Sequence, residues 1–125
     1  MNVILDASAL IGVERGATRI EDVLELYRRR GEYLRTPAPA LAQVWRDGPR
    51  QERLSRFLNH VAVLPVDESH AKAAGTLCGR SGTSDAVDAF VALAAEAGDT
   101  IVTSDPHDMK ALTSARGEPV RIVCV

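Results

Sequence analysis

The feature that most constrains the fold is the alternation of short apolar segments with longer segments of helical periodicity. Five segments are typical of strands: NVILDAS, whose strand ends at Asp6, then EYLRTPA, VAVLPVD, TIVTS and VRIVCV. Apolar strands that alternate with helices indicate a parallel sheet that helices cover on both faces. The sequence therefore predicts an α/β fold of three layers, α/β/α, around a central parallel sheet of about five strands.

The segments between these strands carry the signals of helices. TRIEDVLELYRRRG has apolar residues at helical spacing, acids early and arginines late, and it ends at Gly31. APALAQVWRDG and PRQERLSRFLNH predict two helices, each with a proline near its start, separated at Gly48. Further helices are predicted over DESHAKAAGTLCGRSG, after Ser84 and from Pro106. No linker or repeat divides the chain, so residues 1–125 are expected to form a single domain.

Composition places the chain among ordinary globular proteins. No basic region precedes the first apolar run, and no apolar stretch is long enough to cross a bilayer. Cys78 and Cys124 have neither metal-ligand spacing nor the pattern of a disulfide framework. We therefore expect a cytoplasmic protein without membrane association, and the net charge of −2 favours no class of partner by itself.

Aspartates gather where the predicted strands end and the predicted helices begin. Asp6 ends the first strand and Asp105 ends TIVTS, and the carboxyl ends of parallel strands share the edge at which ligands bind. Asp85 and Asp88 are three residues apart, so they lie on one face of the helix that follows Ser84. Three separate segments are thus predicted to bring carboxylates to one place.

Local capping is the alternative explanation for these acids, because aspartate is favoured at helix N-termini. It is the better explanation for Asp85 taken alone, and it fits Asp105 as well as a site does. Asp88 is harder to explain in this way, since one residue suffices to cap a helix. Asp6 has the weakest local explanation, because Ser8 could cap the next helix in its place. The group is therefore a stronger signal than any member.

Carboxylates that share one cleft repel one another and raise one another's pKa unless a positive group joins them. A set of carboxylate oxygens suits Mg²⁺ or Mn²⁺, whereas zinc prefers histidine and cysteine. The histidines, His60, His70 and His107, have no ligand spacing. Carboxylates with bound Mg²⁺ are suited to the hydrolysis of phosphodiesters.

Three stretches of the chain together resemble the PIN domain, and in particular the VapC-type ribonuclease toxins of toxin–antitoxin pairs and their actinobacterial relatives. The stretches are VILDASAL, APALAQVWRDG and DAVDAFVALAAEAGDTIVTSD, and the resemblance covers essentially the whole chain. It implies a Mg²⁺-dependent endoribonuclease, with Mn²⁺ as a possible substitute, in which metal-activated water cleaves RNA. It also implies a homodimer that a small antitoxin protein neutralises.

The resemblance implies a role for each acid. The family's first acid matches Asp6, its third matches Asp88, and its fourth matches Asp105, so these three are the implied metal ligands. Asp85 is an added or competing ligand one turn before Asp88. The implied supporting residues near the metal are Thr103, Ser104 and Asp108.

One position departs from the family pattern. The family's second acid is a glutamate in the helix after the second strand, and this chain has Gln43 there. A glutamine oxygen is neutral and would weaken a second metal ion more than the first. Asp47, one helical turn later, could substitute. An active nuclease, a slow nuclease and a binding module that does not cut all stay open, and the three aspartates favour activity.

The arginines of WRDGPRQERLSRF are candidates for holding RNA phosphates. Arg46 precedes Arg50, Arg53 and Arg56, and the last three have the spacing of one stripe on a regular helix. The alternative is a solvated helix face, which Glu52 would support. Nearby, Trp45 is explained either by core packing or by a partner surface. We predict RNA contacts for Arg46, Arg50 and Arg53.

Two other classes of acidic site fit the sequence poorly. A phosphoacceptor signalling domain requires adjacent acids after the first strand and a lysine near the last, and Asp6 has no acidic neighbour. A phosphatase of the two-aspartate type requires an acid two residues after Asp6, where this chain has Ser8.

Overall fold

A single parallel sheet forms the middle of the molecule. The computed structural model describes residues 1–125, and its five strands lie in the order β3-β2-β1-β4-β5. All pairings are parallel, and Val3 of β1 lies between Leu34 of β2 and Thr100 of β4. The strands are β1 Asn2–Leu5, β2 Tyr33–Pro37, β3 Val61–Leu64, β4 Thr100–Thr103 and β5 Arg121–Cys124. The predicted five-stranded parallel sheet is confirmed.

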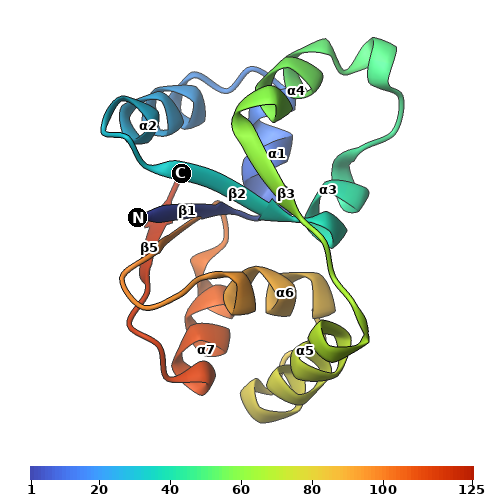
Figure 1. Cartoon of the computed structure of the whole chain (residues 1–125), viewed down its shortest axis with the longest axis vertical. Coiled ribbons are helices and arrows are strands. Elements are labelled where there is room, and N and C mark those ends of the chain that lie inside the picture. The colour runs from blue at the N-terminus through green and yellow to red at the C-terminus, as the bar shows by residue number, and fades with distance from the viewer.

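Helices cover both faces of this sheet, which confirms the three-layer prediction. Figure 1 shows α1, α2 and α4 on one face and α5, α6 and α7 on the other, while α3 follows the end of β2. The helices are α1 Ala7–Glu14, α2 Thr18–Arg29, α3 Ala38–Val44, α4 Glu52–Phe57, α5 Glu68–Ser81, α6 Ala86–Ala94 and α7 Pro106–Arg116. None has both the length and the apolar composition that a membrane span requires.

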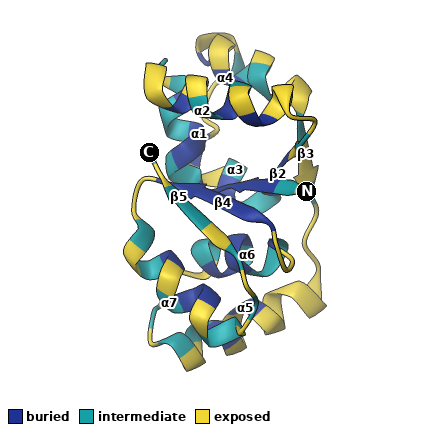
Figure 2. Ribbon diagram, turned by 90° about the vertical axis from the view of Figure 1, so that its left-hand side faces the viewer, coloured by how far each residue is buried: buried dark blue, intermediate teal, exposed yellow.

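Each face of the sheet has its own apolar core, because side chains of a strand alternate between its faces. Val3 and Leu5 of β1 pack beneath α1 and α2, whereas Ile4 packs against the helices of the opposite face. Figure 2 shows the central strands buried between helices whose outer surfaces are exposed, while the edge strands β3 and β5 are partly exposed. Burial on both sides is the physical reason for the apolar strands in the sequence.

The region between β2 and β3 differs from the prediction. The helix predicted to reach Gly48 ends at Val44, and the next is divided into the short 3₁₀ turn η1 Gly48–Arg50, α4, and the 3₁₀ turn η2 Leu58–His60. Gln51 causes the early end, since its side-chain amide donates to the Val44 carbonyl at 2.9 Å. Asp47 therefore lies in a turn and not on the helix face that carries Gln43.

Candidate active site

Three helix N-termini meet at the carboxyl edge of the central strands. Asp6 follows β1 and caps α1, Asp85 caps α6, and Asp105 follows β4 and caps α7. Their carboxylates accept hydrogen bonds from the backbone N–H groups of Ala9, Asp88 and His107, at 2.9, 3.0 and 3.3 Å respectively. Each aspartate thus caps a helix. A capping role therefore does not distinguish an aspartate that also belongs to a functional site from one that is only structural.

Asp6 is the most buried of these acids, with 4% of its surface exposed. The expectation that Ser8 could replace it as the cap is wrong, because the Ser8 hydroxyl instead donates to Asp6 Oδ1 at 2.6 Å. The same Ser8 oxygen accepts a hydrogen bond from the Ser104 backbone N–H at 2.9 Å. Ser8 therefore joins Asp6 to the end of β4, a link between distant segments that sequence patterns do not reveal.

Asp88 shows that the carboxylates of several elements act on one another. Burial, the first cause, together with the negative charges of Asp85, Asp6 and Asp108, raises the pKa of Asp88 from 3.8 to about 7. A hydrogen bond with the Asp85 side chain adds to the shift. No lysine or arginine forms an ion pair with any of these four carboxylates. The edge therefore carries negative charge that the protein leaves without a partner.

α7 contributes two acids that lie in different surroundings. Asp105 is exposed, and its backbone N–H donates to the Thr103 hydroxyl at 3.1 Å. Asp108 is half-buried and is the α7 carboxylate that raises the pKa of Asp88. The electrostatic group thus consists of Asp6, Asp85, Asp88 and Asp108, which we call the acidic edge.

The acidic edge fits a divalent cation by its chemistry. Its donors are carboxylate oxygens, which Mg²⁺ and Mn²⁺ prefer, and a cation would offset the repulsion that raises the pKa of Asp88. In this conformation no three acidic, histidine or cysteine side chains form a ligand set for one ion. A bound ion would thus require carboxylates to turn toward it or waters to complete its shell, as is usual for Mg²⁺.

Gln43 lies outside the acidic edge. It is exposed on α3 and lines a hollow of about 530 Å³ together with Arg15, Arg46 and Arg50, and no aspartate of the acidic edge lines that hollow. Asp47 lies in the same hollow, where its carboxylate pairs with Arg50 at 3.6 Å. The idea that Asp47 could substitute for the missing glutamate from the same helix face is therefore wrong.

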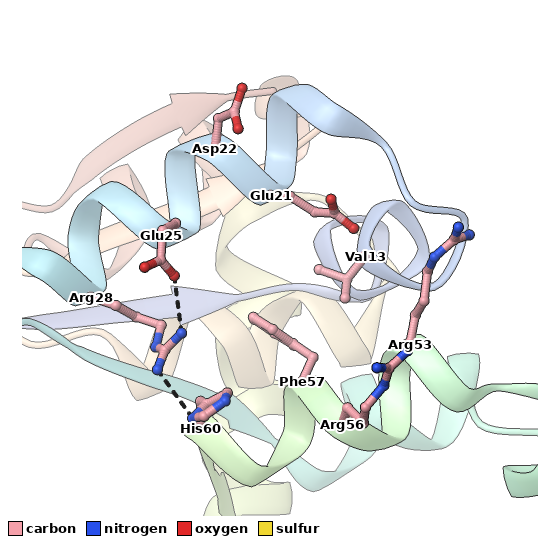
Figure 3. Close-up of a pocket in the computed structure, with 9 residues that line it drawn as sticks. All are labelled: Val13, Glu21, Asp22, Glu25, Arg28, Arg53, Arg56, Phe57 and His60. Atoms are coloured by element: carbon pink, nitrogen blue, oxygen red, sulfur yellow. Dashed lines mark hydrogen bonds and ion pairs between the residues drawn. The ribbon is translucent and has the colours of Figure 1, made fainter.

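The predicted arginine stripe is also wrong as geometry. Arg50 belongs to η1, whereas Arg53 and Arg56 belong to α4 and line a separate hollow opposite α2. Figure 3 shows these two arginines across from Glu21 of α2. The division arises because Gln51 interrupts the helix between Arg50 and Arg53. The RNA-binding roles of Arg46, Arg50 and Arg53 stay predictions.

Trp45 is not a core residue, because 39% of its surface is exposed. An apolar hollow beside it is lined by Ala38, Leu41, Ala42, Trp45 and Leu58. The interpretation of Trp45 as core packing is therefore wrong, and the interpretation as a partner surface stays open.

The fold and the site together describe an α/β/α domain with an acidic group at the carboxyl edge of its parallel sheet. The model of the PIN domain family matches residues 3–113, and the chain therefore belongs to the PIN domain family. The resemblance seen in the sequence is thus confirmed.

A solved structure supports the same fold. The chain is similar to one in the crystal structure of VapBC2 from Rickettsia felis bound to a DNA fragment from the promoter, with a TM-score of 0.73 and 16% sequence identity. The match covers 98% of this chain and 99% of that chain. A comparison with curated protein sequences found no match.

Proposed function

We propose that this protein is a divalent-metal-dependent endoribonuclease and the toxin of a toxin–antitoxin pair. The observation that carries the proposal is the acidic edge, where carboxylates from α1, α6 and α7 act on one another without a basic partner. Membership of the PIN domain family supports nuclease activity. The choice of RNA as substrate rests on the resemblance of the sequence to VapC-type toxins.

Asp6, Asp88 and an α7 acid would hold Mg²⁺ or Mn²⁺. We place Asp108 beside Asp105 in this role, because Asp108 is the one that influences Asp88. When bound, such an ion supplies an activated water and stabilises charge on the phosphate oxygens. Hydrolysis with the 3′-oxygen as leaving group would yield 5′-phosphate and 3′-hydroxyl ends.

The remaining residues of the site position these acids. Asp6 Oδ1 is held by Ala9 and Ser8, so its Oδ2 is the oxygen left for a ligand. The Thr103 hydroxyl donates to the Asp105 carbonyl and so holds the turn between β4 and α7. The Ser104 N–H binds Ser8. Asp85 fixes the first turn of α6 and keeps negative charge beside Asp88.

Two protein partners complete the proposal. The similarity to a VapBC2 structure supports an antitoxin partner for this chain, and such a pair would act in the cytoplasm. The apolar hollow lined by Ala38, Leu41, Ala42, Trp45 and Leu58 favours a homodimer, because a contiguous apolar surface is costly to leave in water.

RNA cleavage tests the proposal directly. Purified protein is incubated with a mixed RNA pool in Mg²⁺, Mn²⁺ or EDTA, beside Asp6→Asn and Asp67→Asn. Asp67 is a matched control, because it also caps a helix, α5, but its side chain is exposed and lies outside the acidic edge. We expect metal-dependent cutting by the wild type and Asp67→Asn, and none by Asp6→Asn. Cutting that persists in EDTA, or in Asp6→Asn, contradicts the proposal.

A binding module that does not cut is the second candidate. Gln43 favours it, since the position of the family's second acid is neutral and lines a hollow that no carboxylate of the acidic edge lines. A wild type that is inert with every metal but still binds RNA would support this candidate. The preparation must be free of bound antitoxin, which would also silence a nuclease.

A further inference from the structure

The hollow around Gln43 carries an excess of positive charge at a fixed position. Its charged lining consists of the arginines Arg15, Arg46 and Arg50 and the acids Glu14 and Asp47. Asp47 pairs with Arg50, whereas no carboxylate pairs with Arg15 or Arg46. We call this hollow, defined by Arg15, Gln43, Arg46 and Arg50, the arginine hollow.

A buried side chain holds the wall of the arginine hollow in place. Gln51 is only 8% exposed, and its carbonyl oxygen accepts hydrogen bonds from the backbone N–H groups of Arg46 and Asp47 at 2.8 and 3.1 Å. Its amide donates to Val44 at 2.9 Å. The turn that carries Arg46 is therefore ordered before any ligand arrives, which lowers the entropic cost of binding.

The guanidinium groups retain donors for an anion. Arg46 Nη1 donates to the carbonyls of Trp45 and Ala42 at 2.7 and 3.2 Å, which orients the group and leaves Nε and Nη2 without a protein acceptor. The Arg15 side chain makes no hydrogen bond or ion pair within the protein. Such guanidinium groups bind phosphate oxygens through charge-assisted hydrogen bonds.

The hollow between α2 and α4 provides the contrast. There Arg28, Arg53 and Arg56 are matched by Glu21, Asp22 and Glu25, so the lining has no excess charge when His60 is neutral. Arg28 is already engaged with Glu25 at 3.0 Å and with His60 at 3.2 Å (Figure 3). An anion is therefore favoured in the arginine hollow and not in this one.

The arginine hollow lies one short helix away from the acidic edge. Asp6 caps the N-terminus of α1 and Arg15 caps its C-terminus, and the helix rise puts their backbones about 13 Å apart. A single RNA strand covers this distance in a few nucleotides. A strand cut at the acidic edge can thus extend along α1 and reach the arginines.

We propose that the arginine hollow is a phosphate subsite for the RNA strand, in which Arg15 and Arg46 bind a phosphate beyond the scissile one and Gln43 contacts the same nucleotide. The inference rests on the proposed ribonuclease function. In this proposal Gln43 contacts the RNA substrate and does not bind the metal ion. The neutral amide suits this position, because a glutamate there would repel phosphate and neutralise an arginine.

Binding without cleavage tests the subsite. In an Asp6→Asn background with EDTA, the affinity for a labelled single-stranded oligoribonucleotide is measured at several salt concentrations. We expect Arg15→Gln and Arg46→Gln each to weaken binding about fivefold to tenfold and to lower the salt slope by roughly one ion. Arg29→Gln is the control, since Arg29 is a strongly exposed arginine of α2 outside both hollows. Wild-type affinity and slope in Arg15→Gln overturn the subsite.

Stability measurements separate binding from a purely structural role. Arg15 and Arg46 lie at the ends of α1 and α3, where a cation also interacts with the helix dipole. A dipole role alone lowers the melting temperature and leaves RNA affinity unchanged, which contradicts the subsite. Because the Arg15 side chain makes no hydrogen bond or ion pair in the protein, Arg15→Gln is expected to fold normally and is the decisive variant.

Gln43→Glu provides an independent test. We expect it to weaken RNA binding by a factor similar to that of Arg15→Gln. Unchanged RNA affinity with faster Mg²⁺-dependent cleavage, measured in the chain with native Asp6, overturns the assignment of Gln43 to the subsite. If the wild type cuts RNA but Arg15→Gln binds normally, the subsite fails while the nuclease function stands. Loss of binding in Arg15→Gln, with an antitoxin-free wild type that is inert with every metal, supports a phosphate site in the arginine hollow and contradicts the nuclease.

Discussion

Two helices of this protein begin with aspartates in the same local arrangement but in opposite electrostatic surroundings. Asp67 caps α5 and accepts a hydrogen bond from the His70 N–H at 3.0 Å, and Asp85 caps α6 in the same way at 3.0 Å from Asp88. At α5 the backbone hydrogen bond from His70 lowers the pKa of Asp67. At α6 burial and neighbouring carboxylates raise the pKa of Asp88 to about 7. The capping hydrogen bond depends only on neighbouring residues in the sequence, whereas the acidic site depends on carboxylates that other elements bring close to the helix.

The largest expected difference between the two helices is in RNA cleavage. Asp88→Asn removes a proposed metal ligand, and we expect it to lower the rate at least about 100-fold, since even outer-shell partners of a metal contribute 10- to 100-fold. Asp67→Asn keeps its cap and is expected to cut at the wild-type rate. Initial rates at saturating Mg²⁺ measure both. A rate for Asp88→Asn within a few-fold of the wild type would remove Asp88 from the ligand set.

The next difference concerns stability and pH in the absence of metal. Between about pH 4 and pH 7 the folded chain keeps the Asp88 proton that the unfolded chain has lost, so the free energy of unfolding falls as the pH rises through this window. We expect a fall on the order of 2 kcal/mol, because each pKa unit corresponds to about 1.4 kcal/mol and solvent screens part of the interaction.

Urea unfolding in EDTA at pH 4.5 and pH 7.5 measures this fall, and Asp88→Asn should reduce it. The contribution of Asp67 to the free energy of unfolding changes with pH in the opposite direction. Its lowered pKa stabilises the fold above pH 3.8, and this contribution is lost as the pH falls through the folded-state value. Asp67→Asn should therefore leave the fall between pH 4.5 and pH 7.5 in place. An equal fall in wild type and Asp88→Asn would show that other groups cause it.

The smallest effect is expected at the α6 cap itself. Asp85→Ala removes the bond to the Asp88 N–H and should destabilise the chain by about 1 kcal/mol, the usual cost of a lost cap. Asp85→Asn keeps the cap and removes only a charge beside Asp88, so it should lower the pKa of Asp88 and slightly raise the free energy of unfolding at neutral pH. Carboxyl NMR titration measures the pKa. An unchanged Asp88 pKa in Asp85→Asn would contradict the described electrostatic coupling.

Much of the fold could be predicted because its cause is local. Strands buried on both faces are mostly apolar, and their buried centres are Val3, Ile4 and Leu5 in β1 and Ile101 and Val102 in β4. The ends of the helices between β2 and β3 could not be predicted from the sequence, because the side chain that ends α3 belongs to Gln51, seven residues after Val44. The sequence predicted that Asp47 and Gln43 share one helix face and that three arginines form one stripe. Both predictions are wrong because the Gln51 side chain interrupts the helical segment.

The candidate site shows the same division. The sequence by itself determined that aspartates stand at strand ends and helix starts, since strand length and capping preference are read along the chain. Only the tertiary structure decided that Asp108 acts on Asp88, that Ser8 joins Asp6 to Ser104, and that Gln43 lies among arginines. The reason is physical: pKa shifts and hydrogen bonds depend on distances across the sheet edge, and sequence spacing does not encode those distances.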